Sequence, residues 1–347
     1  MDLSKIFIKN ASPTKIGGQA VMEGIMMRGK DRIATVIRNP KGGMRIRVEP
    51  LKKPGAWKKI PILRGVISFV SSMVTGCSIL MYSAEVLESF EEESEAKPEE
   101  TDRLTLFLEK HFGEKGALTA MLYMSVVVAV LFTVGIFIVL PTFLVSACRH
   151  ITENEILLNL IEGVLRICLF VGYVAAISRM PEIRRVFQYH GAEHKSIHCY
   201  ENGLALTPEN AQTFETLHPR CGTSFMMFVM VISLLLFSLL GWPNLLLRIA
   251  SRLALIPLIA GISYELLQWA GRSDSAIVKV LSLPGIALQK LTTRCPDMEQ
   301  LEVAIVALKA CLVEDWTPEL VIADIDPQGN VTQRPDLKEA ELAKKNV

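Results

Sequence analysis

Long apolar runs separated by short polar stretches dominate the pattern of the chain. Four of them, residues 118–147, 156–177, 225–240 and 249–270, are predicted to cross a membrane, because a helix needs roughly 20 apolar residues to span the bilayer. The third run is short for a span and requires a tilt or neighbouring protein. The pattern therefore predicts an all-α integral membrane protein with about four transmembrane helices.

A fifth apolar stretch, Pro61 to Tyr82, is rich in serine and glycine and follows a cluster of lysines. As a further span it would place the basic loop of residues 179–224 outside the cell, against the excess of Lys and Arg in cytoplasmic loops. We therefore interpret it as an interfacial or re-entrant helix. The acidic run Glu88 to Glu100 that follows is typical of a solvated linker.

Basic residues gather in two of the polar segments that border the predicted spans. The loop of residues 179–224 and the stretch after the fourth run carry Arg179, Arg184, Arg185, Lys195, Arg220, Arg272, Lys279, Lys290 and Arg294. The loops after the first and third runs carry only Arg149 and Arg248, respectively. The positive-inside rule predicts a multi-pass protein of the cell membrane with both termini and the loop of residues 179–224 in the cytoplasm.

The first 60 residues predict a small β unit. Ile33 to Arg38 and Met44 to Val48 have the composition of strands, and Asn39 to Gly43 between them has that of a turn. The predicted organisation is a cytoplasmic β-rich unit (1–60), an interfacial helix plus acidic linker (61–116), a four-helix membrane domain (117–270) with a helical cytoplasmic His/Cys loop (179–224), and cytoplasmic C-terminal helices and tail (271–347).

Composition narrows the class of protein. Half of the residues (50%) are hydrophobic, and the formal net charge is +1, so the lipid bilayer is the expected partner and nucleic acid is not. The seven cysteines are scattered and odd in number, which argues against a secreted disulfide framework.

Histidine and cysteine concentrate in the polar stretch between the second and third runs. Four of the six histidines of the chain lie there, and Cys221 is the candidate ligand among the two cysteines of the stretch, Cys199 and Cys221; the histidines are His190, His194, His198 and His218. A helix that begins near Pro181 would place the first three histidines on one face, because side chains at i and i+4 are neighbours. Imidazoles and a thiolate at such spacing suit a soft divalent metal, with zinc as the predicted ion.

Glu193 lies beside these histidines. His190-x-x-Glu193-His194 is the inverted zincin arrangement, in which the carboxylate acts as the general base on metal-bound water. Those enzymes add a distal Glu ligand, and Glu265 lies at a suitable separation in the sequence. Alternatively, His218 and Cys221 would complete a closed tetrahedron, whereas an open site would keep three ligands plus water. The sequence leaves this choice open.

Two interpretations without a metal compete with this one. The histidines and Glu193 could face solvent or lipid headgroups on a basic surface helix, and Cys221 could be a small buried residue. For His198 we expect a local hydrogen bond rather than metal ligation.

Four motifs carry a resemblance to a known family. They are Gly17–Arg28, Phe187–Lys195, His218–Phe225 and Tyr264–Glu265. Together they resemble the YqhQ-like family, bacterial membrane proteins of unknown function labelled as predicted metal-dependent enzymes. Matched by position, the resemblance implies a site formed by His190, Glu193, His194, His218 and Cys221, with Glu265 as a further candidate. The chain departs from the expected pattern at Cys295, where the family is expected to have a glutamate.

These observations predict a membrane-embedded metal-binding protein. The leading hypothesis is a zinc-dependent hydrolase at the cytoplasmic membrane face, in which Glu193 activates water to attack a peptide or amide. The alternative is a non-enzymatic membrane scaffold or biogenesis factor with a structural metal site and an unknown protein partner. A transporter is ranked last, because Glu162 and Arg166 are the only strong ionisable candidates within the predicted spans.

Overall fold

The structure is a computed structural model that describes residues 16–51, 59–92, 127–147, 154–241, 244–270, 275–314 and 317–338, with positions 12, 14, 55, 124, 125, 152 and 273. The chain packs as two compact units. The sheet unit comprises residues 1–92, 173–229 and 260–347, and the helical unit comprises residues 93–172 and 230–259.

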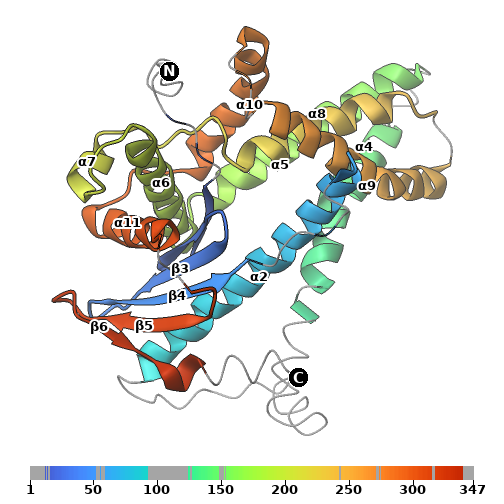
Figure 1. Cartoon of the computed structure of the whole chain (residues 1–347). Helices are drawn as coiled ribbons and strands as arrows, with labels where there is room; N and C mark the ends of the chain where they lie inside the picture. Colours follow the sequence, from blue (N-terminus) through green and yellow to red (C-terminus); the bar gives the residue numbers. More distant parts are fainter. Residues whose placement is uncertain are drawn as a thin grey trace, which may run out of the picture. The chain divides into compact units, whose positions relative to one another are not determined.

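Within the described residues, six strands form one antiparallel sheet in the order β1 to β6 (Figure 1). The strands are β1 (Gly17–Val21), β2 (Gly24–Arg28), β3 (Arg32–Arg38), β4 (Met44–Pro50), β5 (Val321–Ile325) and β6 (Val331–Gln333). The predicted strands at 33–38 and 44–48 are confirmed as β3 and β4. Gly42 and Gly43 in the turn between them have φ angles of 94° and 84°, the left-handed region that glycine adopts without a steric penalty.

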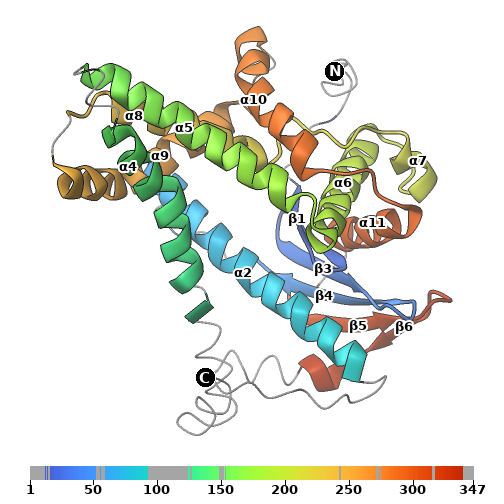
Figure 2. The same ribbon diagram turned by 180° about the vertical axis from the view of Figure 1, so that it is seen from behind.

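The C-terminal region, for which the sequence predicts helices and a tail, also contributes two strands to this sheet. Strand β5 pairs with β4, with Ala323 opposite Ile46, and β6 pairs with β5. Figure 2 shows β4, β5 and β6 side by side in the view from behind.

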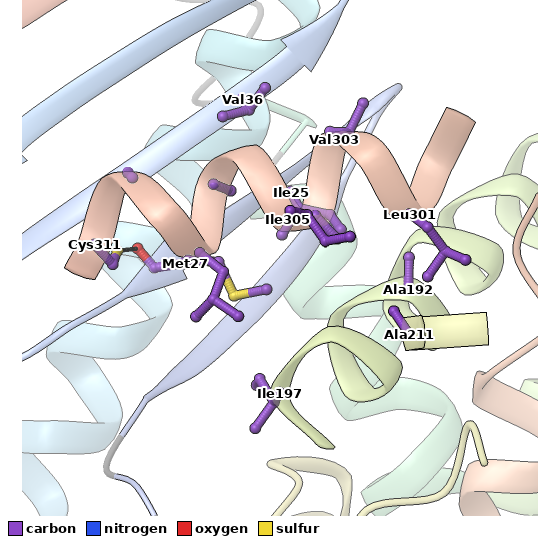
Figure 3. Close-up of a cluster of buried hydrophobic side chains, with 14 of the residues drawn as sticks. Ile25, Met27, Val36, Ala192, Ile197, Ala211, Leu301, Val303, Ile305 and Cys311 are labelled. Carbon is purple, nitrogen blue, oxygen red and sulfur yellow. Dashed lines mark hydrogen bonds between the residues drawn. The ribbon is translucent and has the colours of Figure 1, made fainter. Parts of the chain in front are cut away.

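Alternation along the strands gives the sheet two apolar faces, because successive side chains point to opposite sides. On one face, Ile25, Met27 and Val36 pack against α6 (Pro181–Glu201) and α11 (Met298–Leu312) (Figure 3). Helix α11 contributes Leu301, Val303 and Ile305 to this core. Full burial of each large aliphatic side chain contributes about 1.5–3 kcal/mol, so this core fixes α6, the helix that carries the histidines.

Helix α2 (Leu63–Glu92) covers the other face of the sheet. There Ile79 packs with Met26 and Ile33, while Tyr82, Val86 and Phe90 pack with Ile37.

Two arginines of β4 also face α2. The guanidinium carbons of Arg45 and Arg47 lie 4.7 Å and 4.5 Å from the ring centroids of Phe90 and Tyr82. Arg45 Nε also forms an ion pair with Asp324 Oδ1, at 2.7 Å. These contacts allow charged residues to alternate with apolar ones on β4, a strand that is covered on both faces.

Four described helices are long and apolar enough to cross a membrane: Leu63–Phe90 of α2, Val127–Ala147, α5 (Glu155–Ile177) and α9 (Leu245–Ala270). The second of them contains η2 (Gly135–Val139) and ends with α4 (Leu140–Ala147). Three of the four coincide with predicted spans. The fourth is α2, whereas α8 (Thr223–Ser238), in the third predicted run, is a shorter apolar helix of 16 residues. The number of candidate spans agrees with the prediction, but α2 takes the place of the third predicted run. Helix α2 is long enough because it continues as far as Glu92.

The packing of α2 bears on how far it can enter a bilayer. Its last third, from Ile79 to Phe90, lies on the sheet. The preceding residues, 63–78, extend about 24 Å at 1.5 Å per residue, which is less than the roughly 30 Å of hydrocarbon core. This packing favours the interfacial or re-entrant placement, which stays a prediction. Residues 93–100 of the predicted acidic linker lie outside the described residues.

The helical unit contains a buried polar cluster. Glu162 of α5 accepts hydrogen bonds from Thr142 Oγ1 at 2.7 Å and from Arg166 at 3.0 Å, and it also pairs with Arg252 of α9. Glu162, Arg166 and Arg252 are at most 6% exposed. Their mutual pairing reduces the cost of placing ionised groups inside apolar helices.

Candidate metal centre

Helix α6 begins where the sequence predicts. Met180 before it is extended, Pro181 occupies the first turn, and Glu182 adds a negative charge at the positive end of the helix dipole. Gly191 is the one helix-weakening residue in the middle. A Cβ at this position would lie 2.0 Å from the carbonyl oxygen of Arg294, so glycine permits the segment after α10 (Ala276–Thr292) to pack directly on α6.

Three of the predicted metal ligands converge. The ligand atoms of His190, His194 and Cys221 lie within 4.8 Å of one another. His190 Nε2 is 3.2 Å from Cys221 Sγ. His194 and Cys221 are buried and His190 is half-buried. Helix α6 supplies the two imidazoles, and the loop between α7 (Pro208–Gln212) and α8 supplies the sulfur.

Backbone carbonyls orient both imidazoles. His190 Nδ1 lies 2.7 Å from the carbonyl oxygen of Thr292, and His194 Nδ1 makes a short hydrogen bond to that of Thr216. A carbonyl oxygen only accepts, so Nδ1 carries the proton in each ring and the Nε2 lone pair is available to a metal. Among the described residues, His194 Nε2 is a buried atom without a hydrogen-bond partner, which is the environment that a metal ion would satisfy.

The separation of the ligand atoms suits zinc. Zinc–nitrogen bonds of about 2.0–2.1 Å and zinc–sulfur bonds of about 2.3 Å place tetrahedral N and S ligands about 3.5 Å apart. The distance from His190 Nε2 to Cys221 Sγ, 3.2 Å, differs from this value by only a few tenths of an ångström. The three ligand atoms lie within 4.8 Å of one another, so binding of zinc would require side-chain rotations that bring all of them to this spacing.

Cys221 has the ionisation state that a metal ligand requires. Burial raises its pKa, but His194 and His190 lower it more strongly, so the pKa lies well below its ordinary value. The backbone N–H and hydroxyl of Thr223 donate to its sulfur at 3.4 Å and 3.3 Å. Burial lowers the pKa of His190, yet the Cys221 thiolate raises it to about 9. Without a metal the two groups form an imidazolium–thiolate pair, and a metal ion would take the place of that proton.

Glu193 lies beside the three ligands and is held by the first strand of the sheet. The backbone N–H of Gly18 donates to Glu193 Oε1 at 2.8 Å. Burial raises the pKa of Glu193, and the neighbouring His190 and His194 partly oppose that rise. A Cβ on Gly18 would lie 2.9 Å from Glu193 Cδ, so a glycine is needed for this close approach.

His218 lies next to these ligands, and among the described residues its Nε2, like that of His194, is buried without a hydrogen-bond partner. Its ring centroid is 5.5 Å from that of His194, its Nδ1 accepts from the backbone N–H of Arg220 at 3.3 Å, and its Nε2 is 3.7 Å from Glu201 Oε2. Burial lowers the pKa of His218 to about 3. The imidazole is therefore neutral, with its Nε2 proton directed towards Glu201.

Glu201 completes this neighbouring network. Burial raises its pKa, but hydrogen bonds from His218 and Thr14 and the charge of Arg220 outweigh burial and lower it to about 2. His198 also makes a hydrogen bond, from Nε2 to the carbonyl oxygen of Leu217 at 3.0 Å, although this partner is distant in sequence and not the local one that was expected.

Glu265, the other candidate ligand, forms an ion pair. Its Oε1 accepts from Arg64 Nε at 2.7 Å and from the Ile62 backbone N–H at 3.2 Å. Within the described part of the chain, Glu265 and His218 are not members of the His190–His194–Cys221 group. Cys295 is an exposed free cysteine.

Sequence reasoning missed the residues that orient the ligands. Thr292 and Thr216 act through backbone carbonyls and Gly18 acts through its amide, and such groups leave no side-chain signature. The close approach at Gly191 is a weak signal that was available, because an unforced glycine inside a helix costs stability.

The comparisons identify the family. Residues 60–314 match the family described as "Protein of unknown function (DUF1385)". The chain belongs to this family. It is also similar to "Uncharacterized protein YqhQ" of Bacillus subtilis (strain 168), with 38% identity over 305 residues that cover 86% of this chain and 92% of the relative. No solved structure matches it significantly. The YqhQ-like resemblance is confirmed, whereas the label of metal-dependent enzyme gains no support from either description.

Proposed function

We propose that the chain is a membrane-embedded zinc protein in which His190, His194 and Cys221 bind the metal and a fourth position is left to water. The observation that carries this proposal is the convergence of one ring nitrogen from each histidine and the Cys221 sulfur within 4.8 Å of one another. Three protein ligands plus water are typical of catalytic zinc, whereas structural zinc is held by four protein ligands. The group of three protein ligands therefore favours a catalytic zinc site, as in a hydrolase.

In this proposal Glu193 is the general base. When bound, the metal would supply a Lewis acid that lowers the pKa of water and polarises a carbonyl group. Glu193 would accept a proton from that water and return it to the leaving group, and its raised pKa brings it closer to the range in which a general base is effective near neutral pH. The Gly18 amide, which donates to one carboxylate oxygen, holds the side chain in place. The predicted substrate is a membrane-proximal peptide or amide.

We further propose that this centre lies at the cytoplasmic face of the cell membrane. The excess of Lys and Arg in the segment that contains it supports this placement. A reducing compartment would also keep Cys221 available as an unpaired ligand.

Zinc content is the first test. Detergent-purified protein should contain about one zinc per chain by elemental analysis, and a His190→Ala, His194→Ala double variant should lose it. Cys168→Ser, which changes an exposed cysteine, is the control and should keep the metal. Absence of zinc from the wild-type protein after reconstitution, or full zinc in the double variant, would contradict the proposal.

A pair of glycine variants then tests the role of Glu193. In Gly18→Ala the new Cβ would lie 2.9 Å from Glu193 Cδ and 2.6 Å from the Met26 carbonyl oxygen, whereas a Cβ on Gly17 has nothing within 4 Å. Because a misplacement of about 1 Å can cost about 10²-fold in rate, Gly18→Ala should retain zinc and lose most of the cellular function, as should Glu193→Gln. Gly17→Ala should retain both.

The burial of the ligands favours a second candidate, a scaffold with a structural metal. His194 and Cys221 are 1% and 8% exposed, and structural zinc is normally enclosed. Under this alternative, Glu193→Gln retains both the zinc and the cellular function. Loss of function in Glu193→Gln with zinc still bound would exclude it.

A further inference from the structure

A pocket lies within the sheet unit, and its described lining includes Gly222, which follows the ligand Cys221. Its volume is about 450 Å³, within the range of small-molecule sites of roughly 300–1,000 Å³. One wall is a stripe of small residues on α2, Ser68, Ser72 and Gly76, which share a helix face because they are spaced by four. Phe225 near the start of α8 and Leu267 near the end of α9 line other parts of it.

Two lining residues connect this pocket to the chemistry described above. Gly222 directly follows Cys221, and Gln19 directly follows Gly18, whose amide holds Glu193. Gln19 Nε2 donates to the carbonyl oxygen of Gly76 at 3.3 Å, which ties β1 to α2 at the pocket. Gln19 and Gly18 are consecutive in β1 and face opposite sides of the sheet, so the pocket reaches the neighbourhood of the centre through Gly222, which follows the ligand Cys221.

The lining points to the class of ligand. None of the described lining residues is charged, and most are apolar or small. Helices α2 and α9 are also apolar enough to lie in a membrane. An apolar chain fits such a wall, whereas a peptide backbone would bring amide groups that need hydrogen-bond partners when buried.

We propose that this pocket binds the acyl chain of a membrane lipid and presents its ester or amide carbonyl to the His190–His194–Cys221 centre. This inference rests on the proposed hydrolase and replaces its peptide substrate with a lipid ester or amide. In the reaction, the oxygen of water forms a bond to the carbonyl carbon and the bond from that carbon to the leaving oxygen or nitrogen breaks. Glu193 takes the proton from water and returns it to the leaving group. The products are a fatty acid and the alcohol or amine that carried it.

Photolabelling tests the pocket without requiring activity. The probe is phosphatidylcholine with a diazirine near the end of one palmitoyl chain, incorporated into nanodiscs with the full chain, and the labelled peptides are mapped by mass spectrometry. We expect labelling concentrated on the pocket face of α2, reduced at least fivefold by Ser72→Phe, which fills the groove. Ser71→Phe is the matched control, because Ser71 is its exposed neighbour outside the lining.

Cysteine protection is an independent measurement on the wild-type chain. Cys77 lines the pocket, and Cys168 of the helical unit is exposed but does not line it. Added lysophosphatidylcholine should slow the alkylation of Cys77 by N-ethylmaleimide and leave that of Cys168 unchanged.

Three outcomes would overturn the proposal. They are labelling of α2 that Ser72→Phe leaves unchanged, equal protection of both cysteines by the lipid, and protection of Cys77 by a hydrophobic peptide but not by the lipid. Zinc content, measured on the same samples, separates this failure from that of the proposed function, because Ser72→Phe should retain zinc.

Discussion

Replacing Gly191 by alanine tests how the fold positions the first metal ligand. The new Cβ would lie 2.0 Å from the carbonyl oxygen of Arg294, whereas ordinary van der Waals contact begins near 3.4 Å. The two backbones would have to separate by more than 1 Å. The segment that must move also carries the Thr292 carbonyl oxygen, which lies 2.7 Å from His190 Nδ1. In the same segment, the backbone N–H of Arg294 donates to the carbonyl oxygen of Phe187 at 2.8 Å.

The expected effects follow from these contacts. Overpacking of this kind costs about 1–3 kcal/mol of stability. Loss of the hydrogen bond that orients a ligating histidine typically costs about 10–100-fold in metal affinity. We therefore expect Gly191→Ala to weaken zinc binding by about 10–100-fold and to lower the free energy of unfolding by about 1–3 kcal/mol.

Zinc affinity is measured by competition with a chromophoric chelator, and stability is measured by thermal unfolding in detergent. Gly222→Ala is the matched control. It lies next to Cys221, but a Cβ there has nothing within 4 Å, so both quantities should be unchanged. A Gly191→Ala protein that is destabilised but binds zinc with wild-type affinity would refute the idea that the Thr292 carbonyl tunes His190. Wild-type stability would refute the tight contact itself.

Two further predictions concern buried charges. Glu162→Gln leaves Arg166 and Arg252 without their buried carboxylate, so urea unfolding in detergent should show a loss of about 3–5 kcal/mol; a loss below 1 kcal/mol would contradict the pairing. Burial lowers the pKa of His218 to about 3 from 6.5, and hydrogen bonds outweigh burial to lower the pKa of Glu201 to about 2 from 4.5. Each group therefore contributes stability that is fully present above its unfolded-state pKa. That stability is lost as the pH falls towards the folded-state pKa. The melting temperature of the metal-free protein should therefore decrease below pH 6.5, and His218→Gln should make the upper part of this slope less steep, with the contribution of His198, whose pKa burial lowers to about 4, remaining; an unchanged slope would exclude His218 as one of its causes.

The sequence predicted the part of the centre that depends on local geometry. His190 and His194 are four residues apart in a helix with a clear start signal, so their proximity follows from helical periodicity alone. Cys221 was a candidate because it lies in the same polar stretch, yet its approach to His190 depends on the path of the loop before α8. Whether His218 or Glu265 would join the group depended on long-range partners. Glu265 pairs with Arg64, and no periodic pattern in the sequence predicts that contact.

In the fold, too, some elements follow from local sequence signals and others depend on tertiary contacts. Strands β3 and β4 carry strong local signals, with alternating side chains and a turn with two glycines between them. Strands β5 and β6 have five and three residues, and they become strands because β4 offers an edge to pair with. Tertiary context of this kind overrides weak local propensity.

The centre joins four segments that are distant in sequence. Helix α6 supplies two ligands, the loop before α8 supplies the third, β1 holds Glu193, and the end of α10 orients His190. A metal ion at this position would crosslink α6 to the start of α8, so its removal would lower stability whether its role were catalytic or structural. Glu193 lies outside the three-ligand group, and exchanging its carboxylate for an amide leaves that crosslink intact while it removes the base. The response to Glu193→Gln at constant zinc content therefore separates a hydrolase from a scaffold, and the stability of the zinc-free protein does not enter that comparison.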